Sequence, residues 1–147
     1  YLENGPSLNL EHNQSQLFIR MRGRKIYEYA LKNVPDAIKA TIDKAGLDIS
    51  DISKILIHQA NAKMDYAMIG RLFKLYGKKE YDHAISPMTI QQFGNSSVAT
   101  VPTLFDLIRK GKMEGQSFTP GSHILFTSVG AGMNINCVVY KFPEGKI

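Results

Sequence analysis

Three short motifs hold the groups that could take part in chemistry, and the first of them contains His58. This histidine ends the apolar run 54–58 and is followed by Gln59, Ala60 and Asn61. The run predicts a buried parallel strand, and ligands gather at the carboxyl ends of such strands because loops and helix N-termini converge there. His58 is therefore a candidate catalytic residue, although a structural, hydrogen-bonded histidine would leave the same local pattern.

The second motif is the sequence Phe-Gly-Asn-Ser-Ser at 93–97, a glycine turn that leads into a predicted helix. The side-chain amide of Asn95 offers two N–H donors, and the small residues around it let a substrate approach the backbone closely. A substrate-binding turn and a plain helix-capping turn both fit this pattern.

The third motif, Gly130-Ala131-Gly132, lies between two predicted strands near the end of the chain. Its backbone N–H groups could stabilise a negative charge that develops on a substrate oxygen during a reaction. The same three residues could also do no more than close a β-hairpin.

The sequence offers little support for metal or disulfide chemistry. The single cysteine, Cys137, excludes an internal disulfide and any zinc site with two or more thiolates. It lies inside a predicted strand without a neighbouring helix N-terminus, which is typical of a small core residue rather than a nucleophile. The other histidines, His12, His83 and His123, show no metal-ligand spacing, and the P-loop and Rossmann fingerprints are absent. We therefore predict no metal and no cofactor.

The apolar periodicity predicts the elements that must position these motifs. Gly46 is expected to end the first helix, in which Pro35 must produce a kink or a restart. Residues 78–92 show no clear period and are interpreted as a connection. Strands that alternate with helices and end in a hairpin predict an α/β fold with a mixed sheet. The predicted elements are a lead-in at 1–16, strands at 17–21, 54–58, 123–128 and 134–142, and helices at 24–45, about 62–76 and from the capping residue Ser96 or Ser97 to Gly111.

Length and composition fit one soluble domain. The chain has 147 residues, of which 44% are hydrophobic and 21% are charged. The uncharged stretch 121–140 is too polar and too rich in glycine to span a bilayer, and residues 1–6 do not resemble a secretion signal. We therefore expect a cytoplasmic protein without a membrane segment. The missing initiator methionine suggests that the chain was cut from a longer one.

The chain is basic. Its 18 Lys and Arg residues outnumber its 13 Asp and Glu residues, so the net charge is +5. Clusters of positive charge attract an acidic protein, a nucleic acid or an anionic membrane, and solvated lysines at helix ends would look the same. No zinc finger and no RNP-type aromatic motif supports nucleic-acid binding.

Taken together, the motifs resemble the C-terminal half of the β-ketoacyl-acyl-carrier-protein (ACP) synthase III family. The resemblance implies a thiolase-like half-domain at 17–147, which is one half of a duplicated, layered αβαβα fold, and a homodimer in the intact enzyme. It covers about residues 17–142 and rests on four segments in family order: Met21–Tyr27, His58–Asn61, Gly94–Ser97 and Gly130–Gly132.

According to this resemblance, the reaction is a decarboxylative Claisen condensation of an acyl-CoA primer with malonyl-ACP, which starts fatty-acid synthesis. His58 and Asn95 would be the catalytic pair that stabilises the thioester enolate, with neutral His58 presenting an N–H to the substrate. The turn at 130–132 would supply a further N–H to the oxyanion. Asn61 and Gly23 would contact the pantetheine arm of the substrate.

The resemblance also accounts for the positive charge. Lys63 and Arg71 would dock the acyl carrier protein, and this acidic partner fits the net charge better than nucleic acid does. Acyl-CoA and malonyl-ACP are the implied substrates. No cofactor is implied, and neither a nucleic acid nor a membrane is an implied partner.

Three departures from the family pattern matter. The last turn is Gly-Ala-Gly-Met at 130–133 instead of the usual Gly-Gly-Gly-Phe, and the stretch 78–92 is longer than usual. No residue matches the nucleophilic cysteine of the family, so we predict that this chain alone is inactive. The alternatives are a related acyltransferase of specialised metabolism, a non-catalytic carrier-protein-binding or dimerisation module, and a basic nucleic-acid-binding domain.

Overall fold

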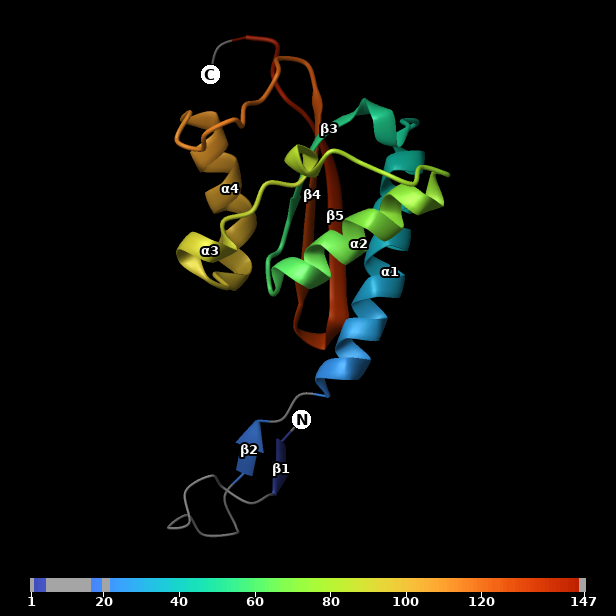
Figure 1. Cartoon of the computed structure of the whole chain (residues 1–147), viewed down its shortest axis with the longest axis vertical. Coiled ribbons are helices and arrows are strands. Elements are labelled where there is room, and N and C mark those ends of the chain that lie inside the picture. The colour runs from blue at the N-terminus through green and yellow to red at the C-terminus, as the bar shows by residue number, and fades with distance from the viewer. Residues whose placement is uncertain (1, 5–16, 20–21, 146–147) are drawn as a thin grey trace.

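The computed structural model describes residues 2–4, 17–19 and 22–145. Strand β1 (Leu2–Asn4) pairs antiparallel with β2 (Leu17–Ile19), and this hairpin lies beyond the N-terminal end of the first helix, away from the main sheet (Figure 1). The strand predicted at 17–21 is confirmed over residues 17–19. The predicted lead-in is wrong for residues 2–4, which form a strand because β2 offers them a partner. The rest of the lead-in and Met21 lie outside the described residues.

Helix α1 (Gly23–Lys44) is one continuous helix, so Pro35 does not restart it, and the alternative of a kink stays a prediction. Packing of the apolar face of this helix compensates for the one helical hydrogen bond that is lost because proline has no N–H. Gly46 ends the helix as predicted: its φ is 71°, and the N–H of Leu47 donates to the carbonyl of Ile42, which completes a Schellman motif. The buried face consists of Ala30, Val34, Pro35, Ile38 and Ile42.

The main sheet is mixed and has the strand order β3-β4-β5 among the described residues. β3 (Ile52–Ile57) runs parallel to β4 (His123–Gly130), and β5 (Asn134–Lys141) returns antiparallel to β4. These pairings confirm the predicted parallel strand and the terminal hairpin. β3 begins earlier than predicted, directly after a 3-10 turn at Ile49–Asp51.

Helices cover both faces of this sheet, which makes three layers (Figure 1). α1 and α2 (Ala62–Leu75) pack on one face, whereas α4 (Thr100–Arg109) packs on the other. Successive side chains of β3 alternate between the faces, so Ile55 and Ile57 join the core under α1 and α2 while Leu56 joins the core under α4. The predicted α/β fold class is confirmed.

The connection at 78–92 and the start of α4 differ from the prediction. The connection contains a 3-10 turn at His83–Ile85, and the short helix α3 (Ile90–Phe93) begins within it. A further 3-10 turn at Ser97–Ala99 precedes α4, so that helix begins only at Thr100. Neither Ser96 nor Ser97 caps α4 with its side chain, because a positive φ of 50° at Ser97 interrupts the helical path.

Candidate active site

The first and third motifs meet at the carboxyl ends of β3 and β4. His58 follows β3, and its backbone N–H donates to the carbonyl of Thr127 on β4 at 2.9 Å, which extends the parallel pairing by one residue. The turn at 130–132 begins at Gly130, the last residue of β4. His58 and this turn line one cavity of about 790 Å³, so the fold brings together two motifs that are far apart in the sequence.

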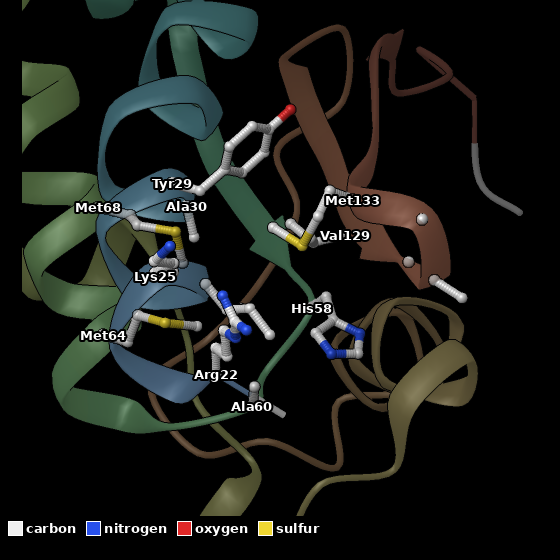
Figure 2. Close-up of a pocket in the computed structure, with 14 residues that line it drawn as sticks. Arg22, Lys25, Tyr29, Ala30, His58, Ala60, Met64, Met68, Val129 and Met133 are labelled. Carbon is white, nitrogen blue, oxygen red and sulfur yellow. The ribbon is translucent and has the colours of Figure 1, made fainter. Parts of the chain in front are cut away.

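The cavity has apolar walls and a positively charged margin. Figure 2 shows Met64 and Met68 of α2 across the cavity from His58, with Val129 and Met133 near the end of β4. Arg22 and Lys25, which are exposed at the start of α1, complete the lining on that side. A site of this shape suits a flexible ligand with an apolar stem and a negatively charged end.

The second motif is joined to His58 through the backbone of Ser97. The Nδ1 atom of His58 lies 3.1 Å from the Ser97 carbonyl oxygen, and the Ser97 N–H donates to Oδ1 of Asn95 at 2.9 Å. Both candidate catalytic side chains therefore bind the same residue. Because Oδ1 of Asn95 is the acceptor in this bond, its side-chain NH₂ group is left as the donor for a ligand.

The bond from His58 to Ser97 changes one part of the sequence-based interpretation. A carbonyl oxygen can only accept a hydrogen bond, so Nδ1 of His58 carries the proton in this contact. In the neutral ring, Nε2 then has a lone pair and no N–H. With this bond in place, a donor N–H at Nε2 requires the imidazolium, so the expectation that the neutral ring suffices stays a prediction.

The turn after β4 has a backbone conformation that requires special residues. Residues Ala131–Met133 form a 3-10 turn in which Gly132 has a φ of 72° and Met133 a φ of 58°. The side chain of Asn134 holds the turn, because its Nδ2 donates to the Ala131 carbonyl at 2.9 Å. The contribution of a backbone N–H from this turn to an oxyanion stays a prediction.

The predicted pantetheine contacts lie close to the cavity but do not line it. Asn61 caps α2, since its Oδ1 accepts from the N–H of Lys63 at 3.0 Å. Gly23 is the first residue of α1, and a Cβ at this position would meet no atom within 4 Å. Their neighbours Ala60 and Arg22 do line the cavity.

The predicted carrier-protein contacts, Lys63 and Arg71, are both exposed on α2. Their separation of eight residues corresponds to about 12 Å along the helix axis. Lys63 lies in the first turn, next to the cavity, whereas Arg71 lies further along the helix.

Two residues that organise the site, Ser97 and Gln59, lie within the predicted motifs, but their contacts with distant segments were not predicted. The Asn-Ser-Ser sequence offered a signal for the first, because an asparagine side chain often binds the N–H two residues further along. Strand alternation offered a signal for the second. Gln59 has the same parity as Ile55 and Ile57, so its side chain points toward the core, where it is fully buried.

Two titratable groups, the buried Asp65 and the half-buried Cys137, lie outside the proposed chemistry. Burial raises the pKa of Asp65 to about 7, and neither of its carboxyl oxygens has a hydrogen-bond partner among the described residues. Burial also raises the pKa of the Cys137 thiol, whose sulfur lies 3.6 Å from Oγ1 of Thr127. A protonated thiol of this kind is a poor nucleophile.

The described part of the chain contains neither a cluster of metal-binding side chains nor a helix that could span a membrane. Among residues 2–4, 17–19 and 22–145, no three His, Cys, Asp or Glu side chains are grouped so that they could hold a metal ion. No helix within these same ranges is long and apolar enough to cross a membrane.

Solved structures share this arrangement of helices and mixed sheet. The 3-oxoacyl-(acyl carrier protein) synthase III of Pseudomonas aeruginosa matches with a TM-score of 0.71 at 22% identity, over 97% of this chain and 39% of that one. The corresponding synthase of Aquifex aeolicus matches with a TM-score of 0.67 at 27% identity, over 85% of this chain and 37% of that one. The fold is therefore thiolase-like.

Among proteins with the thiolase-like fold, sequence comparison identifies one family. Residues 42–142 match the family described as 3-oxoacyl-[acyl-carrier-protein (ACP)] synthase III C terminal. The β-ketoacyl-[acyl-carrier-protein] synthase III of Erythrobacter litoralis is 32% identical over 143 residues, which are 97% of this chain and 40% of that protein. The chain belongs to the 3-oxoacyl-ACP synthase III C-terminal family, and it spans less than half the length of the curated relatives that it matches.

Proposed function

We propose that this chain supplies the enolate-stabilising half of a β-ketoacyl-ACP synthase III, which condenses an acyl-CoA primer with malonyl-ACP. One observation carries the proposal: His58 and Asn95 bind the carbonyl and the N–H of the same residue, Ser97. Each side chain thereby uses one polar atom, Nδ1 of His58 or Oδ1 of Asn95, to bind the protein backbone, and its other polar atom is left for a ligand. A purely structural pair would not need to keep both.

The proposed chemistry begins with the loss of CO₂ from the malonyl thioester. The bond between the carboxylate carbon and the adjacent carbon breaks, and its electron pair moves toward the thioester oxygen to form an enolate. Asn95 Nδ2–H and the Nε2–H of His58 as the imidazolium donate hydrogen bonds to this oxygen. Removing one such donor typically costs about 10²–10³-fold in rate. The enolate carbon then attacks the carbonyl carbon of the acyl thioester, which a nucleophile outside this chain carries. A C–C bond forms, the C–S bond of the acyl thioester breaks, and the thiolate of that nucleophile is the leaving group.

The rest of the site would bind the two substrates. The apolar cavity would take the pantetheine arm, with Asn61 and Gly23 at its margin, and the turn at 130–132 would offer a backbone N–H to an oxyanion. Lys63 and Arg71 would attract the acidic carrier protein. We propose a cytoplasmic homodimer for the intact enzyme, with no resident cofactor.

The isolated 147-residue chain should not form an acyl-enzyme. Its only thiol, Cys137, is half-buried, and burial raises its pKa, so it should not accept the primer.

The two half-reactions test the proposal when they are measured separately in a complete synthase polypeptide that contains this chain. We expect His58→Ala and Asn95→Ala each to slow malonyl-thioester decarboxylation by about 10²–10³-fold while acylation of the nucleophile changes by less than about twofold. His123→Ala, at the opposite end of β4, is the matched control and should leave both rates unchanged. Equal loss of both half-reactions would contradict the proposal. Decarboxylation that persists in both variants would favour a non-catalytic module.

A further inference from the structure

The buried side chain of Gln59 binds a segment far along the chain with both ends of its amide. Nε2 donates to the Pro87 carbonyl at 2.9 Å, and Oε1 accepts from the Thr89 N–H at 2.8 Å. The side chain is fully buried, as is Thr89 apart from 2% of its surface. In a parallel sheet, one residue of a strand binds a carbonyl and an N–H that are two residues apart on the neighbouring strand. The Gln59 amide binds the backbone of residues 87–89 in this way, in place of a neighbouring strand.

The Gln59 amide and the His58 ring bind the two ends of the segment 89–97. Thr89, at the start of the segment, is bound by Gln59, and Ser97, at its end, is bound by Nδ1 of His58 at 3.1 Å. Asn95 lies between these two points. Because Gln59 and His58 are consecutive and follow β3, the end of one strand controls where Asn95 lies.

We infer that Gln59 is a positioning residue, which sets the placement of Asn95 relative to His58 by clamping residues 87–89 against the end of β3. This inference rests on the proposed function, in which both side chains donate to the same oxygen. A misplacement of about 1 Å in such a site can cost as much as 10²-fold in rate. Glutamine is suited to the task because its amide combines a donor with an acceptor, whereas an ionised carboxylate has acceptors only.

Two variants in the complete synthase polypeptide test the clamp. At alkaline pH, Gln59→Met and Gln59→Glu should each slow malonyl decarboxylation by about 10- to 100-fold, with acylation of the nucleophile nearly unchanged. At acidic pH, Gln59→Glu should regain rate relative to the unmodified protein at the same pH. The protonated carboxyl group again offers one donor and one acceptor, as the amide does. Gln59→Met should not recover, because a thioether cannot donate.

Gln91→Met serves as the matched control, because Gln91 is an exposed glutamine on α3 in the same segment. It should leave both half-reactions unchanged at every pH. Equal slowing of both half-reactions by Gln59→Met, or no recovery of Gln59→Glu at acidic pH, would overturn the inference. The recovery is measured within one folded variant, so it stands even if Gln59→Met fails to fold.

The clamp and the proposed function can fail separately. If His58→Ala and Asn95→Ala leave decarboxylation intact, the proposed function fails, and the clamp is then tested by NMR on the 147-residue chain. Gln59→Met should shift the resonances of the Asn95 side-chain amide and the Ser97 N–H, whereas Gln91→Met should not. Unchanged resonances in Gln59→Met would overturn the clamp itself.

Discussion

The carboxyl edge of the sheet and the apolar core beneath it are held together in different ways. At the edge, Gln59, His58 and Asn95 each hydrogen-bond to backbone groups, and one of these bonds spans 39 residues. In the core, side chains such as Ile57 and Leu72 are fully buried and pack without directional bonds. Loss of an edge bond should displace one side chain, whereas loss of core packing should lower the stability of the whole domain.

Asp65 is an exception to this contrast, because it is a polar side chain in the apolar core. It lies on α2 between cavity-lining methionines and belongs to the core by its complete burial, yet it carries a carboxyl group. Its unpartnered oxygens and its raised pKa show that burial acts on this group without a compensating bond among the described residues. The comparison of edge and core therefore leads to different predictions for three positions.

The largest effect is expected from the core. Leu72→Ala should lower the free energy of unfolding by roughly 2–5 kcal/mol, because it removes apolar contacts and leaves a cavity. His58→Ala at the edge should change it by less than about 1 kcal/mol. Urea denaturation of the 147-residue chain measures both values. Leu75→Ala, on the exposed face of the same helix, is the control, and an equal loss in all three variants would refute the contrast between edge and core.

Asp65 should produce the next largest effect, and it should depend on pH. The ordinary pKa of 3.8 applies to the unfolded chain, whereas the folded value is about 7, so only the folded state holds the proton between these values. Stability should therefore fall as pH rises from about 4 to 7, by about 4 kcal/mol in total, and then level off. Asp65→Asn should abolish this decline, because an amide does not ionise.

Urea denaturation at about pH 5 and about pH 8 measures this change. The Asp65→Asn variant should be much more stable than the unmodified chain at the higher pH, with a smaller difference at the lower one. Asp36→Asn, at an exposed position on α1, should leave the pH profile unchanged. Parallel profiles for Asp65→Asn and the unmodified chain would show that the buried carboxyl group does not control this dependence.

The smallest effect is expected at Ser97, because its two shorter contacts, to His58 and Asn95, use backbone atoms, whereas its Oγ lies 3.4 Å from Oδ1 of Asn95. Ser97→Gly should stabilise the chain by up to about 1 kcal/mol, because glycine adopts a positive φ without strain. Decarboxylation by the complete synthase should stay within about twofold, since the N–H and the carbonyl remain. Ser97→Pro removes the N–H and the positive φ, so it should slow decarboxylation. A strong loss of rate in Ser97→Gly would show that the hydroxyl group is needed.

Much of the fold could be predicted because it depends on local periodicity. The four-residue spacing of apolar residues in α1 and the β-branched run of β3 were readable directly, and Gly46 marked a helix end. Pro35 left a kink and a restart as alternatives, and the helix does not restart there, because tertiary packing compensates for the local cost of the proline. The Ser96 and Ser97 caps were misassigned, because a positive φ at Ser97 has no certain local signature.

The site was predictable in its parts but not in its arrangement. His58, Asn95 and the turn at 130–132 were recognisable as motifs, and the cavity brings the first and third of them together. The connection from His58 to Asn95 through Ser97 joins segments that are far apart in the sequence. The burial of Asp65 likewise depends on how α2 packs, and no local pattern distinguishes it from an exposed first-turn aspartate.

Residue order alone was enough for the α/β class, the strand–helix alternation and the family, because these depend on periodicity and on motifs within single segments. The contact of His58 Nδ1 with Ser97, the bond of the Ser97 N–H to Asn95 and the contacts of the Gln59 amide required the folded chain. Each depends on which backbone group lies opposite a side chain, and strand register and helix packing determine that choice across tens of residues.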